Sequence, residues 1–342
     1  MRNGILAGGN WIIDQVKIID SFPEEEKLVS IFSECISNGG SAYNVLKDLV
    51  KLKADFPLSG LGLVGDDERG DFIISECNEL GISTTQLEKI AGAATSYTDV
   101  MTVKSNGRRT FFHQRGANAL LDIAHFDFSL SNAKIFHLGY LLLLDRLDVL
   151  EDDGLTRGAK VLKLAQENGL LTAADIVSEK SERFSRLIPS ALPFIDYLFV
   201  NEFEAAMITG IETVTTNGVV LPERCREAAK KIIEMGVNKW VVLHFPAGVI
   251  AINSHQECIF QPSIKVPEKL IVGAVGAGDA FAAGVLMGVH DNQPMQVCLE
   301  LGVCAAASSL FASTSSDGVL PKQECLLLKD KYGYRDELIN EA

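Results

Sequence analysis

Short apolar runs alternate with longer helical segments through the second half of the chain, and this alternation restricts the fold more than any other feature. Strands are expected at 133–139, 170–177, 239–245, 248–254 and 257–262, with a strand that passes into a helix across 196–210. Helices are expected at 144–169, 181–194, 222–236 and 296–314. Strands and helices that alternate at these lengths form a parallel sheet covered by helices on both faces. The pattern predicts an α/β fold.

The first part of the chain adds further strands and one segment of different texture. Strands are expected at 4–13 and 60–65, and helices at 41–52 and from about 66 to 80. Residues 95–116 alternate on both sides of Asn106-Gly107, which is typical of a β-hairpin with a tight turn. Polar residues occupy both faces of this hairpin, so we expect a small β lid, with segments near 15–37 and 95–116, outside the central sheet. No linker interrupts the chain, and residues 1–342 are expected to form a single domain.

Residues 271–289 (IVGAVGAGDAFAAGVLMGV) combine a glycine-rich turn with the start of a small, apolar helix. Such a turn aims several backbone N–H groups at one point, with the positive end of the helix dipole behind them. Asp279 lies at the same place. A base that takes a proton from a hydroxyl, next to donors that hold a phosphoryl group, explains this combination. The alternative is an ordinary connection in which Asp279 only caps the helix.

Polar side chains follow several of the expected strands. In an open parallel sheet, ligands bind at the carboxyl ends of the strands. The residues that fall there are Asp14, Asp175, Asn201, Glu204 and Asp279. We therefore expect these five side chains to share one site.

Charge and cysteine content restrict the partners and the compartment. With 31 basic and 45 acidic residues, the formal charge is −14, which argues against nucleic acid and anionic membranes as partners. The seven cysteines are scattered without a CxxC pair, as in a reducing compartment rather than a disulfide framework or zinc site. The first residues do not resemble a signal peptide. A soluble, cytoplasmic protein is expected.

Five segments, in this order and spacing, resemble the ribokinase-like (PfkB) family of carbohydrate and nucleoside kinases. They are GNWIID at 9–14, GGSAYN at 39–44, GLGLVGDDERG at 60–70, VNEFEAAMITG at 200–210 and GAVGAGDAF at 273–281. The resemblance covers essentially the whole chain. It implies a three-layer α/β/α domain with a central, mainly parallel sheet and a small β-sheet lid, and an enzyme that uses ATP and Mg²⁺.

The resemblance also implies a role for each matching residue. Asp279 corresponds to the catalytic base, and Gly276, Ala277 and Gly278 to the anion hole. The residues that correspond to the sugar site are Asp14, Gly39, Gly40, Asn44 and Arg115. Asn201, Glu204, Gly248 and Gly278 correspond to the nucleotide site, where Glu204 would act on magnesium through water. Arg108 and Arg109, at the hairpin tip, are expected to be solvated turn residues.

Three departures from the family pattern leave parts of the site open. Gly273 and Ala274 replace an Asp-Thr pair that contributes to a monovalent-cation site, so activation by potassium stays open. The nucleotide segment is matched only at Gly248, with Leu243 and Phe245 at the other positions, so the residues of the adenine pocket stay open. A further family segment is reduced to Asp175.

The leading hypothesis is an ATP-dependent sugar kinase that closes its lid over a sugar hydroxyl. The alternatives are a nucleoside kinase and a catalytically silent sugar-binding relative; a dinucleotide-binding dehydrogenase is weaker because GxGxxG is not met. A lid with two polar faces also suggests a homodimer that forms through this lid. The sequence does not identify the sugar or nucleoside.

Overall fold

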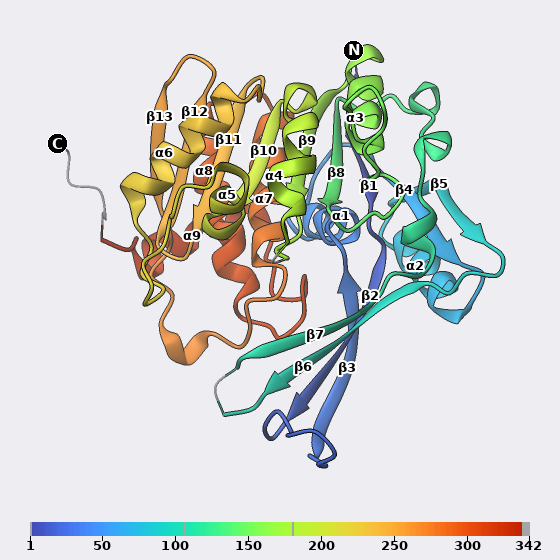
Figure 1. Cartoon of the computed structure of the whole chain (residues 1–342). Helices are drawn as coiled ribbons and strands as arrows, with labels where there is room; N and C mark the ends of the chain where they lie inside the picture. The colour runs from blue at the N-terminus through green and yellow to red at the C-terminus, as the bar shows by residue number, and fades with distance from the viewer. Residues whose placement is uncertain (1, 106, 180, 337–342) are drawn as a thin grey trace.

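A nine-stranded sheet forms the centre of this computed structural model, which describes residues 2–105, 107–179 and 181–336 (Figure 1). Its strand order is β13-β12-β11-β10-β9-β8-β1-β4-β5. The strands are β1 Ile5–Gly9, β4 Leu58–Gly65, β5 Ser83–Ile90, β8 Ile135–Leu141, β9 Leu171–Ile176, β10 Tyr197–Asn201, β11 Trp240–Phe245, β12 Gly248–Asn253 and β13 Cys258–Pro262. From β5 to β11 all neighbours are parallel, whereas β12 and β13 add an antiparallel edge.

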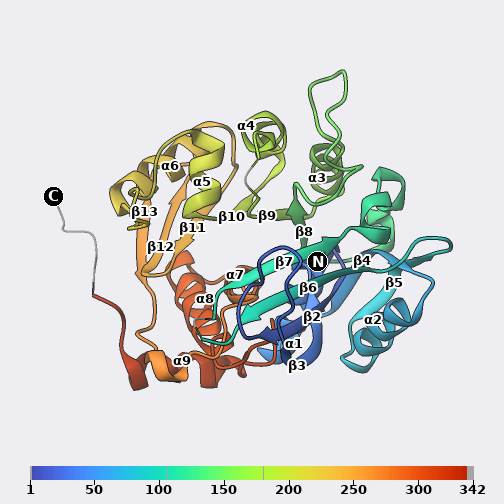
Figure 2. The ribbon, with the colours of Figure 1, turned by 60° about the horizontal axis from the view of Figure 1, so that its bottom comes forward.

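Helices cover both faces of this sheet, as Figure 2 shows. One layer contains α1 Ser41–Lys51, α2 Glu68–Glu79, α7 Ala277–His290, α8 Met295–Ser309 and α9 Lys322–Tyr332. The other contains α3 Arg157–Glu167, α4 Arg183–Leu187, α5 Glu202–Thr209 and α6 Pro222–Glu234. In the first layer α7 and α8 pack closely, because a Cβ on Gly284 would lie 2.8 Å from the Cα of Gly302. The predicted three-layer α/β/α class is confirmed.

A second sheet projects from the sheet's carboxyl edge and forms the lid (Figure 1). Its order is β3-β2-β6-β7, with β2 Ile12–Ile19, β3 Ile31–Gly39, β6 Ser96–Val103 and β7 Arg109–Gln114. β2 begins three residues after β1 ends, so one extended stretch leads from the core into the lid. The hairpin between β6 and β7 was predicted, although Asn106 of its turn lies outside the described residues.

Some elements differ from the sequence-based expectation. Within the expected helix 144–169, only α3 is helical, and residues 142–156 form a loop that is held by Asp148. Within 181–194, α4 is short and gives way to 3₁₀ turns. The edge strand β5 and the helix α9 were not expected, because their apolar periodicity is weak.

Among the described residues, no helix combines the length and apolar character needed to cross a bilayer. The seven cysteines all carry free thiols.

Candidate active site

A cavity of about 450 Å³ lies between the lid and the carboxyl ends of the parallel strands. It brings together most of the residues singled out in the sequence, namely Asp14, Gly40, Asn44, Asp175, Asn201, Glu204, Gly276, Ala277, Gly278 and Asp279. Gly39, Arg115 and Gly248 do not line it. The expectation that the polar strand ends share one site is thus met by the geometry.

Asp279 lies buried in the first turn of α7 and lines the cavity. Its carboxylate accepts a hydrogen bond from Asn44 Nδ2 at 2.7 Å and bonds from the Tyr140 hydroxyl at 2.9 and 3.0 Å. Burial raises the pKa of Asp279 to about 7, aided by the negative charge of Asp175 and opposed by these hydrogen bonds. A carboxyl with this pKa is suited to accept a proton near neutral pH.

The N-terminus of α7 is a glycine turn beside that carboxylate. Gly276 precedes the helix with φ +72°, a left-handed conformation in which a Cβ would lie 2.5 Å from the Ser315 carbonyl oxygen. This conformation directs the first N–H groups of the helix, which have no partner within it, toward the cavity. A buried carboxylate and the N–H groups of a helix start thus face the same cavity.

Asp14 lies on β2, where this strand passes from the core into the lid. Burial raises its pKa to about 7; a hydrogen bond from Thr98 lowers it, and the charge of Asp279 raises it. The Asp14 carboxylate packs against the backbone of Gly39, because a Cβ at this position would lie 2.4 Å from Asp14 Oδ1. Gly39 therefore acts by leaving room for Asp14 rather than by lining the cavity.

Asn201 and Glu204 form a reciprocal cap at the start of α5. The Asn201 side chain accepts from Glu204 N at 2.8 Å, while Glu204 Oε2 accepts from Asn201 N at 2.9 Å. Ser178 and Asn201 Nδ2 donate to the other carboxylate oxygen. Burial raises the pKa of Glu204 to about 8.

These residues fit a hydrated magnesium ion. No group of three potential ligands from His, Cys, Asp and Glu occurs in the described part of the chain. Mg²⁺ retains several waters and takes few direct protein ligands, and a buried carboxylate whose lone pairs are only partly used can accept hydrogen bonds from those waters. Glu204, held by Asn201, offers such a carboxylate at the cavity wall.

A buried polar cluster around Asp175 was not expected from the sequence. Ser41 Oγ donates to Asp175 Oδ2 at 2.6 Å and lies 2.8 Å from His137 Nε2. The three residues come from α1, β8 and β9. This cluster fixes Asp175 at the site, where its charge contributes to the raised pKa of Asp279.

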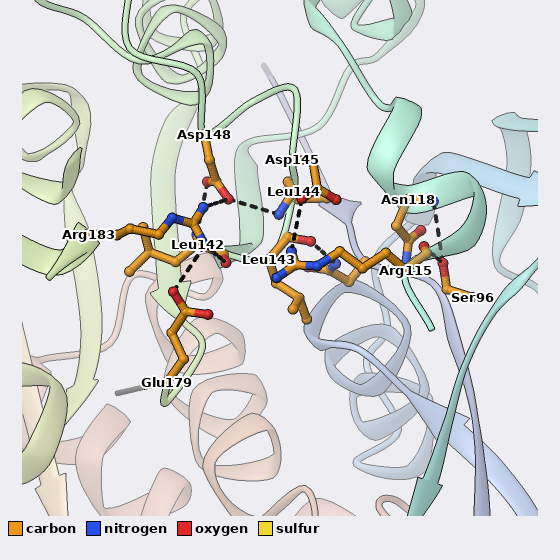
Figure 3. Close-up of polar contacts among 11 residues, drawn as sticks. Ser96, Arg115, Asn118, Leu142, Leu143, Leu144, Asp145, Asp148, Glu179 and Arg183 are labelled. Carbon is orange, nitrogen blue, oxygen red and sulfur yellow. Dashed lines mark hydrogen bonds and ion pairs between the residues drawn. The ribbon is translucent and has the colours of Figure 1, made fainter. Parts of the chain in front are cut away.

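Arg115 lies beside the loop that follows β8 (Figure 3). Its Nη1 lies 3.5 Å from Asp145 Oδ1, in the loop that follows β8. Asp148 holds the same loop by accepting from Leu142 N at 2.9 Å and from Arg183 Nη2 at 2.7 Å. The loop residue Leu143 lines the cavity.

A second cavity of about 380 Å³ adjoins the first. Asn201, His244, Ala274, Ala277 and Gly278 line both. The rest of its wall is mainly apolar and includes Phe245, Val249, Val266, Phe281, Val303 and Leu310. Gly248 does not line it; its role is in the β11–β12 hairpin, where a Cβ would lie 2.8 Å from the Gln261 carbonyl oxygen.

His244 occupies the junction of the two cavities. A Cβ on Gly278 would lie 3.5 Å from its Cε1, so the imidazole stands beside the anion hole. Burial lowers its pKa to about 4, so the ring is neutral at pH 7. Neither His244 nor Tyr140 is selected by a periodicity or motif in the sequence, although both lie near the ends of strands that were expected.

The fold and the cavity define an α/β protein with a buried carboxylate beside a glycine-rich helix start. The pfkB family carbohydrate kinase model matches residues 5–323, and the chain belongs to this family. It is accordingly a phosphotransferase with an alcohol group as acceptor. The predicted family and enzyme class are confirmed.

Individual relatives are distant. A deoxyribokinase of Salmonella typhi is 23% identical over 273 residues, which cover 80% of this chain and 81% of the relative. The structure of Arabidopsis thaliana ribokinase complexed with ribose and ATP has a TM-score of 0.75 and 22% identity and covers 96% of this chain and 99% of that one. A nucleoside kinase of Methanocaldococcus jannaschii has a TM-score of 0.73 and 18% identity, with 96% and 98% coverage. At these identities the two structures establish the fold alone.

Proposed function

We propose that this enzyme transfers the γ-phosphoryl group of ATP to a hydroxyl of a sugar, with Asp279 as the base. The observation that carries this proposal is the buried Asp279 carboxylate, with a pKa of about 7, at the helix start where the two cavities meet. Asp279 takes the hydroxyl proton, and the N–H groups of Ala277 and Gly278 hold the phosphoryl group.

The two cavities suit two substrates. The first, with Asp14 and Asn44 at its wall, would hold the acceptor, and the mainly apolar second cavity would hold the nucleoside part of ATP. Magnesium, when bound with ATP, would neutralise phosphate charge, with Asn201 and Glu204 contacting its waters. Closure of the lid excludes water that would otherwise hydrolyse ATP.

A coupled assay that records ADP formation tests this proposal. Pentoses, hexoses, sugar acids, sugar monophosphates and nucleosides are offered with ATP and Mg²⁺, with and without potassium. Turnover of at least one sugar class supports the proposal. Binding of sugar without binding of ATP, measured by calorimetry, would instead identify a catalytically silent relative.

A nucleoside kinase is the second candidate. Phe111, Tyr140 and Phe199 line the acceptor cavity, and aromatic rings of this kind stack on nucleobases. In the same assay, turnover of adenosine, inosine or cytidine but of no sugar would favour this candidate.

The pH dependence of activity should run opposite to that of stability. We expect kcat to fall as the pH is lowered through about 7, because Asp279 must be ionised to accept a proton. The pKa values of Asp14, Glu204 and Asp279 are raised on folding, so the folded state binds these protons more tightly than the unfolded chain. Stability should therefore rise as the pH is lowered from 8.5 to 6.5.

Initial rates and thermal unfolding temperatures, recorded in one buffer series at constant ionic strength, check both trends. The lowered pKa values of His113 and His244 act in the opposite direction, because their unfolded forms become protonated as the pH approaches 6.5. In this window they offset only part of the effect of the three carboxyl groups. A kcat that is constant between pH 6 and 8 would contradict the role given to Asp279.

We further propose that the enzyme is a homodimer that forms through the lid. The lid exposes large apolar side chains, among them Phe32, Ile36 and Phe112, which are 53%, 66% and 51% exposed. Burial of such a surface against a second copy would be favourable. Light scattering should show a dimer for the wild type and a monomer for Ile36→Glu. Leu327 on α9 is also apolar and exposed, so Leu327→Glu is the control and should remain a dimer. A monomeric wild type would overturn this proposal.

The free thiols suit a reducing compartment, and we place the enzyme in the cytoplasm. Cell fractionation can test this placement.

A further inference from the structure

One arginine faces the acceptor cavity from the lid. Arg109 begins β7, and it is the only arginine or lysine among the described residues that line the cavity. The residue is half-buried, and its guanidinium makes no hydrogen bond or ion pair with any described residue. The expectation that Arg109 is a solvated turn residue is therefore wrong, whereas its neighbour Arg108 is exposed and lines neither cavity.

The carboxylates of the cavity do not neutralise Arg109. Four line the wall, Asp14, Asp175, Glu204 and Asp279, and each is bonded to other groups of the core or of the inner end of the lid. A guanidinium that is partly removed from water without a counter-ion is unfavourable, and a bound anion would relieve this. A bound anion would supply the counter-ion that Arg109 lacks among the described residues.

The lid register places Arg109 at a fixed distance from the sugar site. His113 pairs with Thr98, which pairs with Asp14, and Arg109 pairs with Thr102 further out. Because side chains alternate along a strand, Arg109, Phe111 and His113 share one face, and all three line the cavity. We call Asp14, Thr98 and His113 the inner row of the lid, and Thr102 and Arg109 the outer row. Arg109 and His113 are four residues apart on β7, which at about 3.3 Å per residue gives about 13 Å between the backbones of the two rows. The long arginine side chain can lean along the strand and shorten this distance.

The inner row is built to recognise hydroxyl groups. Thr98 donates a hydrogen bond to Asp14, so its oxygen is left to accept from His113 Nδ1, 3.0 Å away. In the neutral ring, Nε2 is then an acceptor. This atom is buried and has no hydrogen-bond partner in the described part of the chain. Asp14 and His113 thus offer acceptors to hydroxyl donors, whereas Arg109 offers only donors.

We propose that the acceptor substrate is an anionic sugar, whose hydroxyls bind to Asp14 and His113 and whose carboxylate or phosphate binds to Arg109. This inference rests on the proposed kinase function and names the substrate class of that site. The phosphates of ATP are a less suitable partner, because the N–H groups of Ala277 and Gly278 already hold the phosphoryl group and Arg109 does not line the cavity given to the nucleoside. A sugar with an oxyanion at the end remote from Asp279 can donate hydroxyl protons to Asp14 and His113 and accept hydrogen bonds from Arg109.

Binding measurements on the whole enzyme without ATP test this inference apart from catalysis. Aldonic and keto-sugar acids, sugar monophosphates and the matching neutral sugars are titrated by calorimetry, and the two anionic classes distinguish a carboxylate from a phosphate. Wild type is compared with Arg109→Gln and Arg109→Lys, and with Arg108→Gln as the matched control.

We expect at least one anionic sugar to bind more than 10-fold more tightly than its neutral counterpart. Arg109→Gln should lose about 10- to 100-fold of this affinity, the range for a charge-assisted hydrogen bond, and Arg109→Lys should lose less. Arg108→Gln should bind like wild type. The wild-type affinity should also fall with added salt, which supports the inference even if a lid variant folds poorly.

Other outcomes overturn the inference. The inference fails if wild type binds anionic and neutral sugars with equal affinity. It also fails if Arg109→Gln lowers the affinity for anionic and for neutral sugars by the same factor. A higher KM for ATP at unchanged sugar affinity would assign Arg109 to the nucleotide. If an anionic sugar binds through Arg109 but no acceptor is phosphorylated, the kinase proposal fails while this binding site stands.

Discussion

Asp279→Asn is expected to lower kcat by about 10²- to 10⁴-fold, the usual contribution of a general base. The substitution should leave binding of the acceptor and of ATP within a few fold of wild type. Asparagine retains an oxygen that can accept from Asn44 Nδ2, and the Tyr140 hydroxyl can rotate to accept from the new amide. Only the ability to take up a proton is lost.

The effect of Asp279→Asn on stability separates this chemistry from misfolding. Because burial raises the pKa of Asp279, its removal should leave the unfolding temperature at pH 8 unchanged or higher. Asp196→Asn is a matched control. Asp196 is also buried, but it lies just before β10, at the amino edge of the sheet, where its carboxylate accepts from Thr172 N at 2.9 Å. We expect normal kcat for Asp196→Asn, and near-normal turnover in Asp279→Asn would contradict the assigned mechanism.

The parts of the site that could be predicted are those encoded by adjacent residues or by strand ends. The glycine turn before Asp279 and the Asn201–Glu204 cap each lie within four residues, so spacing alone indicates their geometry. Asp14 was located by the rule that ligands bind at the carboxyl ends of parallel strands. These signals do not depend on knowing which strands are neighbours.

The contacts that could not be predicted join segments far apart in the chain. Asn44 and Asp279 are separated by 235 positions, and Tyr140 and Asp279 by 139. No local pattern shows that α1, β8 and α7 meet at one point. The raised pKa of Asp279 was equally inaccessible, since it follows from burial by the whole fold and from the charge of Asp175.

The two lid arginines show that strand register decides which side chains face the cavity. Arg115 matched a family context and was expected at the substrate, whereas Arg109 was placed in solvent. In the structure, Arg109 stands on the cavity face of β7, and Arg115 follows the end of the strand and pairs with Asp145. A shift of one residue along a strand exchanges its two faces, and the polar residues on both faces of this hairpin left the choice undetermined.

Gly276→Ala is expected to lower kcat by about 100-fold or more, comparable with the loss of an oxyanion donor. A Cβ at this position meets the Ser315 carbonyl oxygen at 2.5 Å, so the turn must shift and carry the N–H groups of Ala277 and Gly278 with it. The left-handed backbone, φ +72°, adds a cost of about 1–2 kcal/mol to any residue with a Cβ.

Gly81→Ala separates these two effects. Gly81 has nearly the same backbone, φ +74°, but no atom within 4 Å of a Cβ, and it lines neither cavity. Both variants should lose stability in chemical denaturation, Gly276→Ala the more because of the contact with Ser315. Only Gly276→Ala should lose turnover. Equal kcat values for the two variants would mean that the helix start does not hold the phosphoryl group, because its displacement would then have no effect on the reaction.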